Sequence, residues 1–295
     1  MKVSLECAHC LLERAINQVK LATDDIGVQM EVTAKMLRML TENFNKDSVP
    51  SHIGTERDLL VQRMTGKDPY KELKHLSNSM ALSIFPELQS IVDEVSNKKE
   101  RFRKATLITA AANAIEFDVA GREFSLDELR SVIDEVESDL AIDQIDEFYD
   151  LCSNAKEVLY LMDNAGEIVL DMLLIRELRN IGLKVFAVVK GGPVLNDATR
   201  KDADEVNLHD YVDEVLDTGA PAIGVNFEKD SAEFIQVLND AELIIAKGMG
   251  NFESMTEFTP LAPTIHIMRT KCMPVANQVG VPRNKNVVLI RYPSE

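Results

Sequence analysis

The sequence has no tryptophan, few tyrosines and a shortage of basic residues, with 32 Lys and Arg against 49 Asp and Glu. The formal net charge of -17 argues against a general surface for nucleic acid or an anionic membrane. The scarcity of aromatic rings argues against platforms on which bases stack. A bound cation and a few local lysines can still attract a small anion, so the composition excludes polymeric partners rather than small charged ligands.

Cysteines and long apolar runs are also scarce. Four cysteines in 295 residues do not make a disulfide framework, which predicts a reducing compartment. No signal peptide is recognisable after the first methionine, and no apolar run is long enough to span a bilayer. We therefore expect a cytoplasmic protein that does not contact membranes, with one large domain or two.

The hydrophobic period changes near residue 150. Before it, apolar residues recur at helical spacing without a convincing strand, and Pro50 and Gly54 interrupt the pattern. After Lys156, short apolar runs alternate with helical segments, which is typical of an α/β fold with a mostly parallel sheet. The predicted helices are 11–21, 32–40, 56–64, 73–95, 107–117, 125–136, 143–153, 168–180, 198–207 and 231–238. The predicted strands are 158–162, 184–189, 212–216, 243–246, 264–268 and 287–291.

Polar residues follow three of these strands. Asp163 and Asn164 end the first strand, Asp197 follows the second after a Gly-Gly-Pro turn, and Lys247 follows the fourth. Parallel strands direct their carboxyl ends to one edge of a sheet, so these residues are expected to meet there. Carboxylate and amide oxygens suit Mg²⁺ or Mn²⁺ rather than a soft metal. Taken singly, each motif fits a turn or a helix cap equally well.

Lys247 has a second possible role. It precedes two glycines and an expected helix start near Asn251, an arrangement that can hold a phosphoryl group by an ammonium and by backbone N–H groups. Neither the P-loop order nor a dinucleotide-binding glycine pattern is present. On the Ala-rich segment 107–117, Asn113 and Glu116 are spaced to project from one helix face. A structural hydrogen-bonding role for Asn113 is the alternative.

The remaining candidate site is built from cysteines. Cys7 and Cys10 form a single CxxC at the opening of a helix, whereas a zinc site needs four ligands. Cys272 is the third candidate ligand, with His9 or His266 as the fourth. Packing of these cysteines without a metal is the alternative. Thioredoxin-like chemistry is less favoured, because no predicted strand precedes the CxxC.

These motifs occur in a specific order along the whole chain. They are Cys7-Ala8-His9-Cys10, Ala112-Asn113-Ala114-Ile115-Glu116-Phe117, Asp163-Asn164-Ala165-Gly166-Glu167, Asn196-Asp197, Gly250-Asn251-Phe252-Glu253 and Lys271-Cys272. In this combination the chain resembles the DUF89 (ARMT1-like) family of metal-dependent damage-control phosphatases, closest to its archaeal subfamily I. The resemblance implies a Rossmann-like, mostly parallel sheet flanked by helices over residues 151–295. It implies an all-helical region over residues 1–150, which would form a lid or wall of the site.

The resemblance also implies roles for single residues. Matching positions make Asp163, Asn164 and Asp197 the metal ligands, with Mn²⁺ or Ni²⁺ expected and Co²⁺ or Mg²⁺ as alternatives. They place Lys247 and Asn251 around the substrate phosphate, together with Asn113 and Glu116. Glu116 departs from the family pattern, in which Asp is frequent. The implied reaction is hydrolysis of small phosphomonoesters, including sugar phosphates such as fructose 1-phosphate.

The expected mechanism leaves the nucleophile open. Either water or the Asp163 carboxylate could attack phosphorus. The Asp-x-Asp motif of haloacid-dehalogenase phosphatases is absent, because Ala165 holds its second position, and this favours water. Two other classes of function compete with hydrolysis. One is a non-catalytic sensor that binds a phosphometabolite, and the other is a metal or redox protein centred on Cys7, Cys10 and Cys272.

Overall fold

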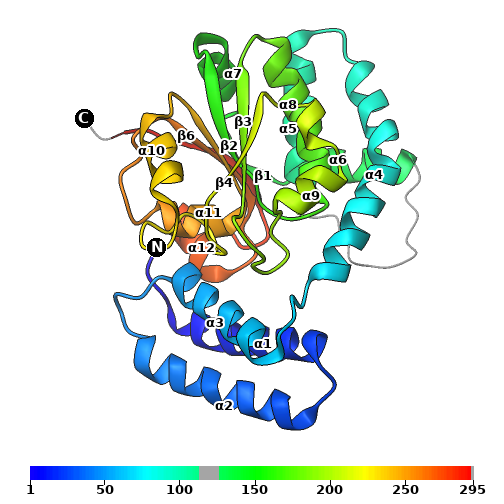
Figure 1. Cartoon of the computed structure of the whole chain (residues 1–295). Coiled ribbons are helices and arrows are strands. Elements are labelled where there is room, and N and C mark those ends of the chain that lie inside the picture. The colour runs from blue at the N-terminus through cyan, green and yellow to red at the C-terminus, as the bar shows by residue number, and fades with distance from the viewer. Residues whose placement is uncertain (113–125, 294–295) are drawn as a thin grey trace.

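The computed structural model describes residues 1–112 and 126–293. A seven-stranded sheet with the order β1-β7-β6-β5-β2-β3-β4 forms its centre (Figure 1). Only the pair β6–β7 is antiparallel, and the other neighbours run parallel. The strands are β1 (Leu140–Asp143), β2 (Glu157–Leu161), β3 (Lys184–Val189), β4 (Glu214–Asp217), β5 (Ile244–Lys247), β6 (Thr264–Arg269) and β7 (Asn286–Arg291). The predicted α/β class with a mostly parallel sheet is confirmed.

Helices cover both faces of this sheet. They are α1 (Leu5–Ala22), α2 (Ile26–Asn43), α3 (Pro50–Thr65), α4 (Lys71–Asp93), α5 (Lys98–Ala111), α6 (Leu126–Ser138), α7 (Ile145–Asn154), α8 (Glu167–Asn180), α9 (Arg200–Glu205), α10 (Ala232–Asp240), α11 (Gly248–Met255) and α12 (Met273–Val279), with a 3₁₀ turn η1 (Leu208–Asp210). Within residues 1–112 and 126–293, no helix combines the length and the apolar character that crossing a membrane requires.

The central strands are apolar on both sides because both sides are covered. Val158, Tyr160 and Met162 lie in the main core, which also contains the buried residues of α4, α5 and α8. Leu159 and Leu161 face the other way, into a smaller core with residues of α10 and α11. Continuous burial of this kind explains why β2 is an unbroken hydrophobic run rather than an alternating one.

The order of the strands fixes where a ligand can bind. From β2 the chain proceeds through β3 to β4 on one side, whereas β5 lies on the other side of β2 and continues to β6. The direction of winding therefore reverses between β2 and β5. In open α/β sheets, the crevice outside the carboxyl ends at such a reversal is the usual ligand site.

The N-terminal helices divide into two groups. Helices α1, α2 and α3 lie together at one end of the molecule (Figure 1) and have small cores of their own. Helices α4, α5 and α6 instead contribute to the main core beneath the sheet. A domain boundary near residue 150 stays a prediction.

Two expectations about the N-terminal half are wrong. A strand, β1, lies before residue 150 and pairs with β7 at the edge of the sheet. Four half-exposed residues are too few to show a period in the sequence. Pro50 does not interrupt a helix but occupies the first turn of α3, where its missing N–H would have no helical partner anyway.

Packing of α8 against the sheet is expected to supply much of the stability. Leu173 is 0% exposed in the main core, whereas Leu37 on α2 is 49% exposed. Leu173→Ala should lower the free energy of unfolding by about 3 kcal/mol, because it removes buried apolar surface and leaves a cavity. Leu37→Ala, the matched control, should change it by less than about 1 kcal/mol. Urea denaturation followed by circular dichroism measures both, and equal losses would contradict this view of the core.

Candidate metal and phosphate site

Two loops at the carboxyl edge of the sheet are joined by backbone hydrogen bonds. Asn164, after β2, forms an antiparallel bridge with Asp197, after β3. The N–H of Ala165 donates to the carbonyl of Asn196 at 2.9 Å, and the N–H of Ala198 donates to the carbonyl of Asp163 at 2.8 Å. The structure therefore brings the three predicted metal ligands together, from two neighbouring strands.

The carboxylates of this pair oppose each other electrostatically. Burial raises the pKa of Asp163 well above its usual range, and the charges of Glu167 and Asp197 raise it further. Burial also raises the pKa of Asp197 to about 6, against the opposing effect of Lys190. Two partly desolvated carboxylates held side by side are costly unless a cation or protons balance them. Such a concentration of buried negative charge favours the binding of a cation.

Asn164 is oriented by its amide nitrogen. Nδ2 donates to Glu167 Oε1 at 2.7 Å and to Asp163 Oδ2 at 3.1 Å. Both amide hydrogens are thereby used, which leaves the carbonyl oxygen Oδ1 as the group that can act as a ligand. Glu167 thus selects which end of the Asn164 amide is available.

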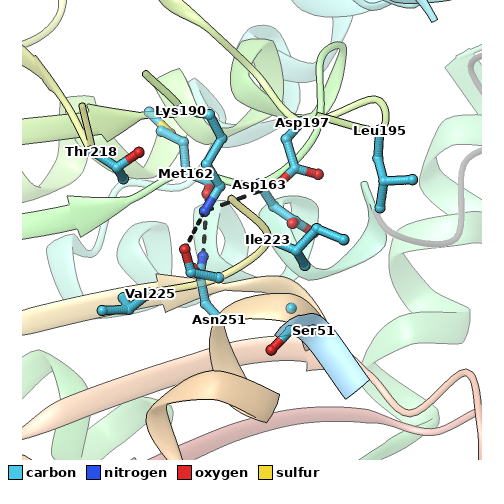
Figure 2. Close-up of polar contacts among 12 residues, drawn as sticks. Ser51, Met162, Asp163, Lys190, Leu195, Asp197, Thr218, Ile223, Val225 and Asn251 are labelled. Carbon is cyan, nitrogen blue, oxygen red and sulfur yellow. Dashed lines mark hydrogen bonds and ion pairs between the residues drawn. The ribbon is translucent and has the colours of Figure 1, made fainter. Parts of the chain in front are cut away.

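Lys190 is a site residue that the sequence analysis missed. It is 4% exposed, and its Nζ donates to the carbonyl of Gly224 at 2.8 Å and lies 4.0 Å from Asp197 Oδ2. Figure 2 shows the Lys190 side chain directed toward Asp197, whereas the amide of Asn251 points to the carbonyl of Met162. Lys190 directly follows β3, just as Lys247 ends β5, so its position at a strand end was the signal that could have identified it.

Lys247 lies deeper than a substrate-contacting residue would. It is 0% exposed, and its Nζ is 2.7 Å from Asp171 Oδ1 and 3.7 Å from Glu167 Oε2. Burial acts to lower the pKa of Lys247, but the two carboxylates outweigh it and the pKa is raised. Burial likewise raises the pKa of Asp171 to about 6 despite Lys247. Lys247 is committed to these acids, so its direct contact with phosphate stays a prediction.

Helix α4 supports the two ligand loops from the helical half. Asn78 Oδ1 accepts the N–H of Gly166 at 2.7 Å. Lys74 Nζ contacts Asp202 Oδ2 at 2.8 Å and the carbonyl of Asp197 at 3.4 Å. The N-terminal half therefore holds the loops that carry the ligands, in addition to any role as a wall.

The loop after β4 and helix α3 complete the surroundings. Ile223 donates its N–H to Thr55 Oγ1 of α3 at 3.0 Å, and in the view of Figure 2 it is drawn between the two aspartates and Ser51 of α3. Asn251 donates from Nδ2 to the carbonyls of Met162 and Lys247, at 3.2 and 2.8 Å. It therefore ties α11 to the ends of β2 and β5. Asn113 and Glu116 fall outside the described residues.

The cysteines lie at the junction of α1 and α12. Cys7 is buried on α1, Cys10 is exposed on the same helix, and Cys272 is the N-cap of α12. Of the two proposed fourth ligands, His9 is exposed, whereas His266 is fully buried against Phe252. In the described part of the chain, no group of three or more His, Cys, Asp or Glu side chains is arranged to hold a metal. The Asp163 site has two such residues, and its third predicted ligand is an amide.

Gly248 is required by the close approach of Asp163. It has φ of +75°, and a Cβ there would lie 1.8 Å from Asp163 Oδ2. Gly280 has a similar φ of +83° but nothing within 4 Å of its Cβ position. Gly248→Ala should displace the Asp163 carboxylate and weaken the predicted Mn²⁺ binding at least about 10-fold. Gly280→Ala carries the same backbone strain and should leave Mn²⁺ affinity unchanged. Titration calorimetry measures both, and equal affinities would contradict the contact.

Comparison with known proteins shows which family has a similar sequence and fold. The model of the damage-control phosphatase ARMT1-like domain matches residues 3–287. A damage-control phosphatase of Archaeoglobus fulgidus is 33% identical, over 95% of this chain and 96% of that protein. An uncharacterized protein of Methanocaldococcus jannaschii is 34% identical, over 99% and 96% respectively. The crystal structure of a DUF89 family protein from Pyrococcus horikoshii superposes with a TM-score of 0.87 at 29% identity, covering 100% of both chains.

Proposed function

Because the chain belongs to the damage-control phosphatase ARMT1-like (DUF89) family, we propose that it is a metal-dependent phosphatase of small phosphomonoesters. The substrates would be phosphorylated metabolites, with sugar phosphates such as fructose 1-phosphate among them. The observation that carries this proposal is the bridge between the loops of Asn164 and Asp197, which gathers two carboxylates and one oriented amide at the reversal of the sheet.

The residues present fit a divalent cation. Asp163 and Asp197 would each supply a carboxylate oxygen, and Asn164 would supply Oδ1, the atom that its hydrogen bonds leave available. The ion would balance the buried negative charge of both aspartates, whose pKa values burial raises. An all-oxygen set favours a hard or borderline ion, and we propose Mn²⁺ or Ni²⁺. When bound, the ion would supply Lewis-acid catalysis at the phosphoryl group.

Lys190 is the cation best placed to hold the phosphate. Its ammonium is desolvated and lies beside Asp197 (Figure 2). Electrostatic stabilisation is stronger in such a water-poor site than in solution. Lys271 is exposed, and its charge acts to lower the pKa of Asp163. We propose that these two lysines neutralise the phosphate while Lys247 holds Glu167 and Asp171 in place.

We further propose that water attacks phosphorus and that Asp163 serves as a ligand. Asp163 Oδ2 accepts a hydrogen bond from Asn164, and the same carboxylate packs against Gly248. A carboxylate held on two sides is poorly placed to approach a phosphoryl group in line.

The non-catalytic sensor and the cysteine-centred protein make different predictions. A sensor would bind phosphometabolites with the same residues but would release no phosphate. A cysteine-centred protein would depend on Cys7 and Cys272 rather than on Asp163. Release of phosphate from a panel of phosphomonoesters, with and without EDTA, separates these functions.

The metal ligands should be indispensable for both binding and turnover. Asp197→Asn removes one of two ligand charges and should lower kcat/KM for fructose 1-phosphate on the order of 1000-fold, with loss of Mn²⁺ binding. Asp204→Asn, an exposed acid on α9, is the matched control and should behave as wild type. Phosphate release and Mn²⁺ titration measure the effects. Undiminished, metal-dependent turnover by Asp197→Asn would refute the site.

Substitution of Lys190 should impair catalysis, whereas substitution of Lys247 should impair stability. Lys190→Met should lower kcat/KM on the order of 100-fold while the protein stays folded, because it removes a charge that faces the phosphate. Lys247→Met should lower the free energy of unfolding by about 3 kcal/mol, because it leaves Asp171 buried without its partner. Phosphatase assays and urea denaturation of both variants test the assignment. A stable Lys247→Met protein that lacks only catalysis would instead place Lys247 at the phosphate.

A further inference from the structure

Arg57 on α3 is a buried cation that forms no ion pair with any carboxylate of the described residues. Its side chain is 2% exposed, and neither Nε nor Nη2 has a hydrogen-bond partner among the described residues. No carboxylate within residues 1–112 and 126–293 forms an ion pair with it. Buried guanidinium groups are normally paired, because desolvating an isolated charge is costly. An unpaired one therefore points to a ligand.

The nearest acid on the same helix is used elsewhere. Asp58 accepts hydrogen bonds from Gln18 and Gln62, and Oδ1 also accepts the N–H of Leu195 at 3.3 Å. Asp58 therefore anchors α3 to the loop that carries Asp197, instead of pairing with Arg57. Arg14 repels Arg57, whereas Tyr70, Cys10 and the partly buried Glu253 attract it without forming an ion pair with it. Burial raises the pKa of Glu253 to about 7 despite the charges of Arg14 and Arg57, so this acid is only partly ionised at neutral pH. Burial lowers the pKa of Arg57 to about 10, so it remains charged at neutral pH.

The guanidinium lies beside Gly54, on the side of α3 that faces the loop of Ile223. Both Nη atoms are 3.9 Å from the position of a Cβ on Gly54, and Ile223 Cδ1 is 3.0 Å from the same point. Thr55 Oγ1 accepts the N–H of Ile223 at 3.0 Å. Ile223 Cγ2 in turn lies 2.9 Å from the position of a Cβ on Gly250, the residue before Asn251 of the site. The absence of a side chain at Gly54 thus leaves Arg57 and Ile223 next to each other at the wall of the site.

The unpartnered atoms define what Arg57 can bind. Nε and Nη2 form one edge of the guanidinium fork, which matches two oxygens of a carboxylate or a phosphate. Ser51, also on α3 and beside Ile223, has a buried Oγ that likewise lacks a partner. Neutral hydroxyls of a simple sugar could satisfy Ser51, but they would not neutralise Arg57.

We infer that Arg57 binds a second anionic group on the substrate, a carboxylate or a phosphate carried by the leaving group. This inference rests on the proposed phosphatase function and narrows its substrate class. The preferred substrates are phosphomonoesters with two anionic ends, one at Asp163, Asp197 and Lys190 and the other at Arg57. The helical bundle would then select substrates by charge as well as enclose them.

Two pairs of substrates test this with the full-length, Mn²⁺-loaded protein. They are 3-phosphoglycerate against glycerol 3-phosphate, and fructose 1,6-bisphosphate against fructose 1-phosphate. Wild type should favour the doubly anionic member of at least one pair on the order of 100-fold in kcat/KM. The pair that shows the preference identifies the second group as a carboxylate or a phosphate. No preference in either pair would overturn the inference.

Variants of Arg57 separate binding from folding. Arg57→Met should abolish the preference by raising KM for the doubly anionic substrate, with less than about a 3-fold change for its partner. Arg57→Lys keeps the positive charge but lacks the two-pronged guanidinium, so it should retain part of the preference for the doubly anionic substrate. The thermal midpoint of Arg57→Met should not fall, because an unpaired buried charge is removed. Arg63→Met, an exposed arginine of the same helix, is the control and should match wild type. If Arg57→Met lowered kcat/KM equally for both members of a pair, Arg57 would have a structural role and the inference would be wrong.

A binding measurement keeps this test independent of turnover. If no phosphoester is hydrolysed, the proposed function fails, and calorimetry of 3-phosphoglycerate, fructose 1,6-bisphosphate and their singly phosphorylated partners then decides about Arg57. Selective loss of binding of a doubly anionic compound in Arg57→Met supports the inference. Equal binding of every compound by wild type and Arg57→Met, or binding of none, contradicts it.

Discussion

The repulsion between Asp163 and Asp197 is the constraint on which the site depends. Backbone hydrogen bonds between the loops after β2 and β3 hold these carboxylates together, although burial raises the pKa of each and the charge of Asp197 raises the pKa of Asp163 further. The rest of the structure maintains this arrangement. Helix α4 supports the loops through Lys74 and Asn78, and Glu167 sets the orientation of Asn164. A bound cation would balance the negative charge of the two aspartates, and an anionic substrate could then bind to that cation.

Two different uses of buried lysine occur at this edge of the sheet. Lys190 lies beside one carboxylate and donates to a carbonyl, so its charge remains available to a phosphate. Lys247 is bound by Asp171 and lies near Glu167, so its charge is consumed within the protein. Arg57 is a third case, a buried cation whose Nε and Nη2 have no hydrogen-bond partner among the described residues. Lys190 and Arg57 therefore supply local positive charge near the two aspartates, although the net charge of the chain is -17.

The sequence revealed the parts of this account that depend on local pattern. Buried runs at 158–162 and 184–189 identified neighbouring strands, and the polar residues after them identified the edge at which Asp163 and Asp197 meet. Strand β1 was missed because its pairing with β7 is not visible in four residues. Lys190 and Arg57 were missed for a related reason. Whether a cation is free or neutralised depends on partners distant in the chain, such as Gly224 for Lys190.

Location of the metal in a crystal tests the central claim most directly. Crystals grown with Mn²⁺ can be measured on both sides of the manganese absorption edge, so that anomalous scattering locates the ion without reference to activity. The account predicts a single strong peak within about 2.3 Å of oxygens of Asp163, Asn164 and Asp197. A peak at Cys7, Cys10 and Cys272 instead, or no peak beside the two aspartates, would contradict it.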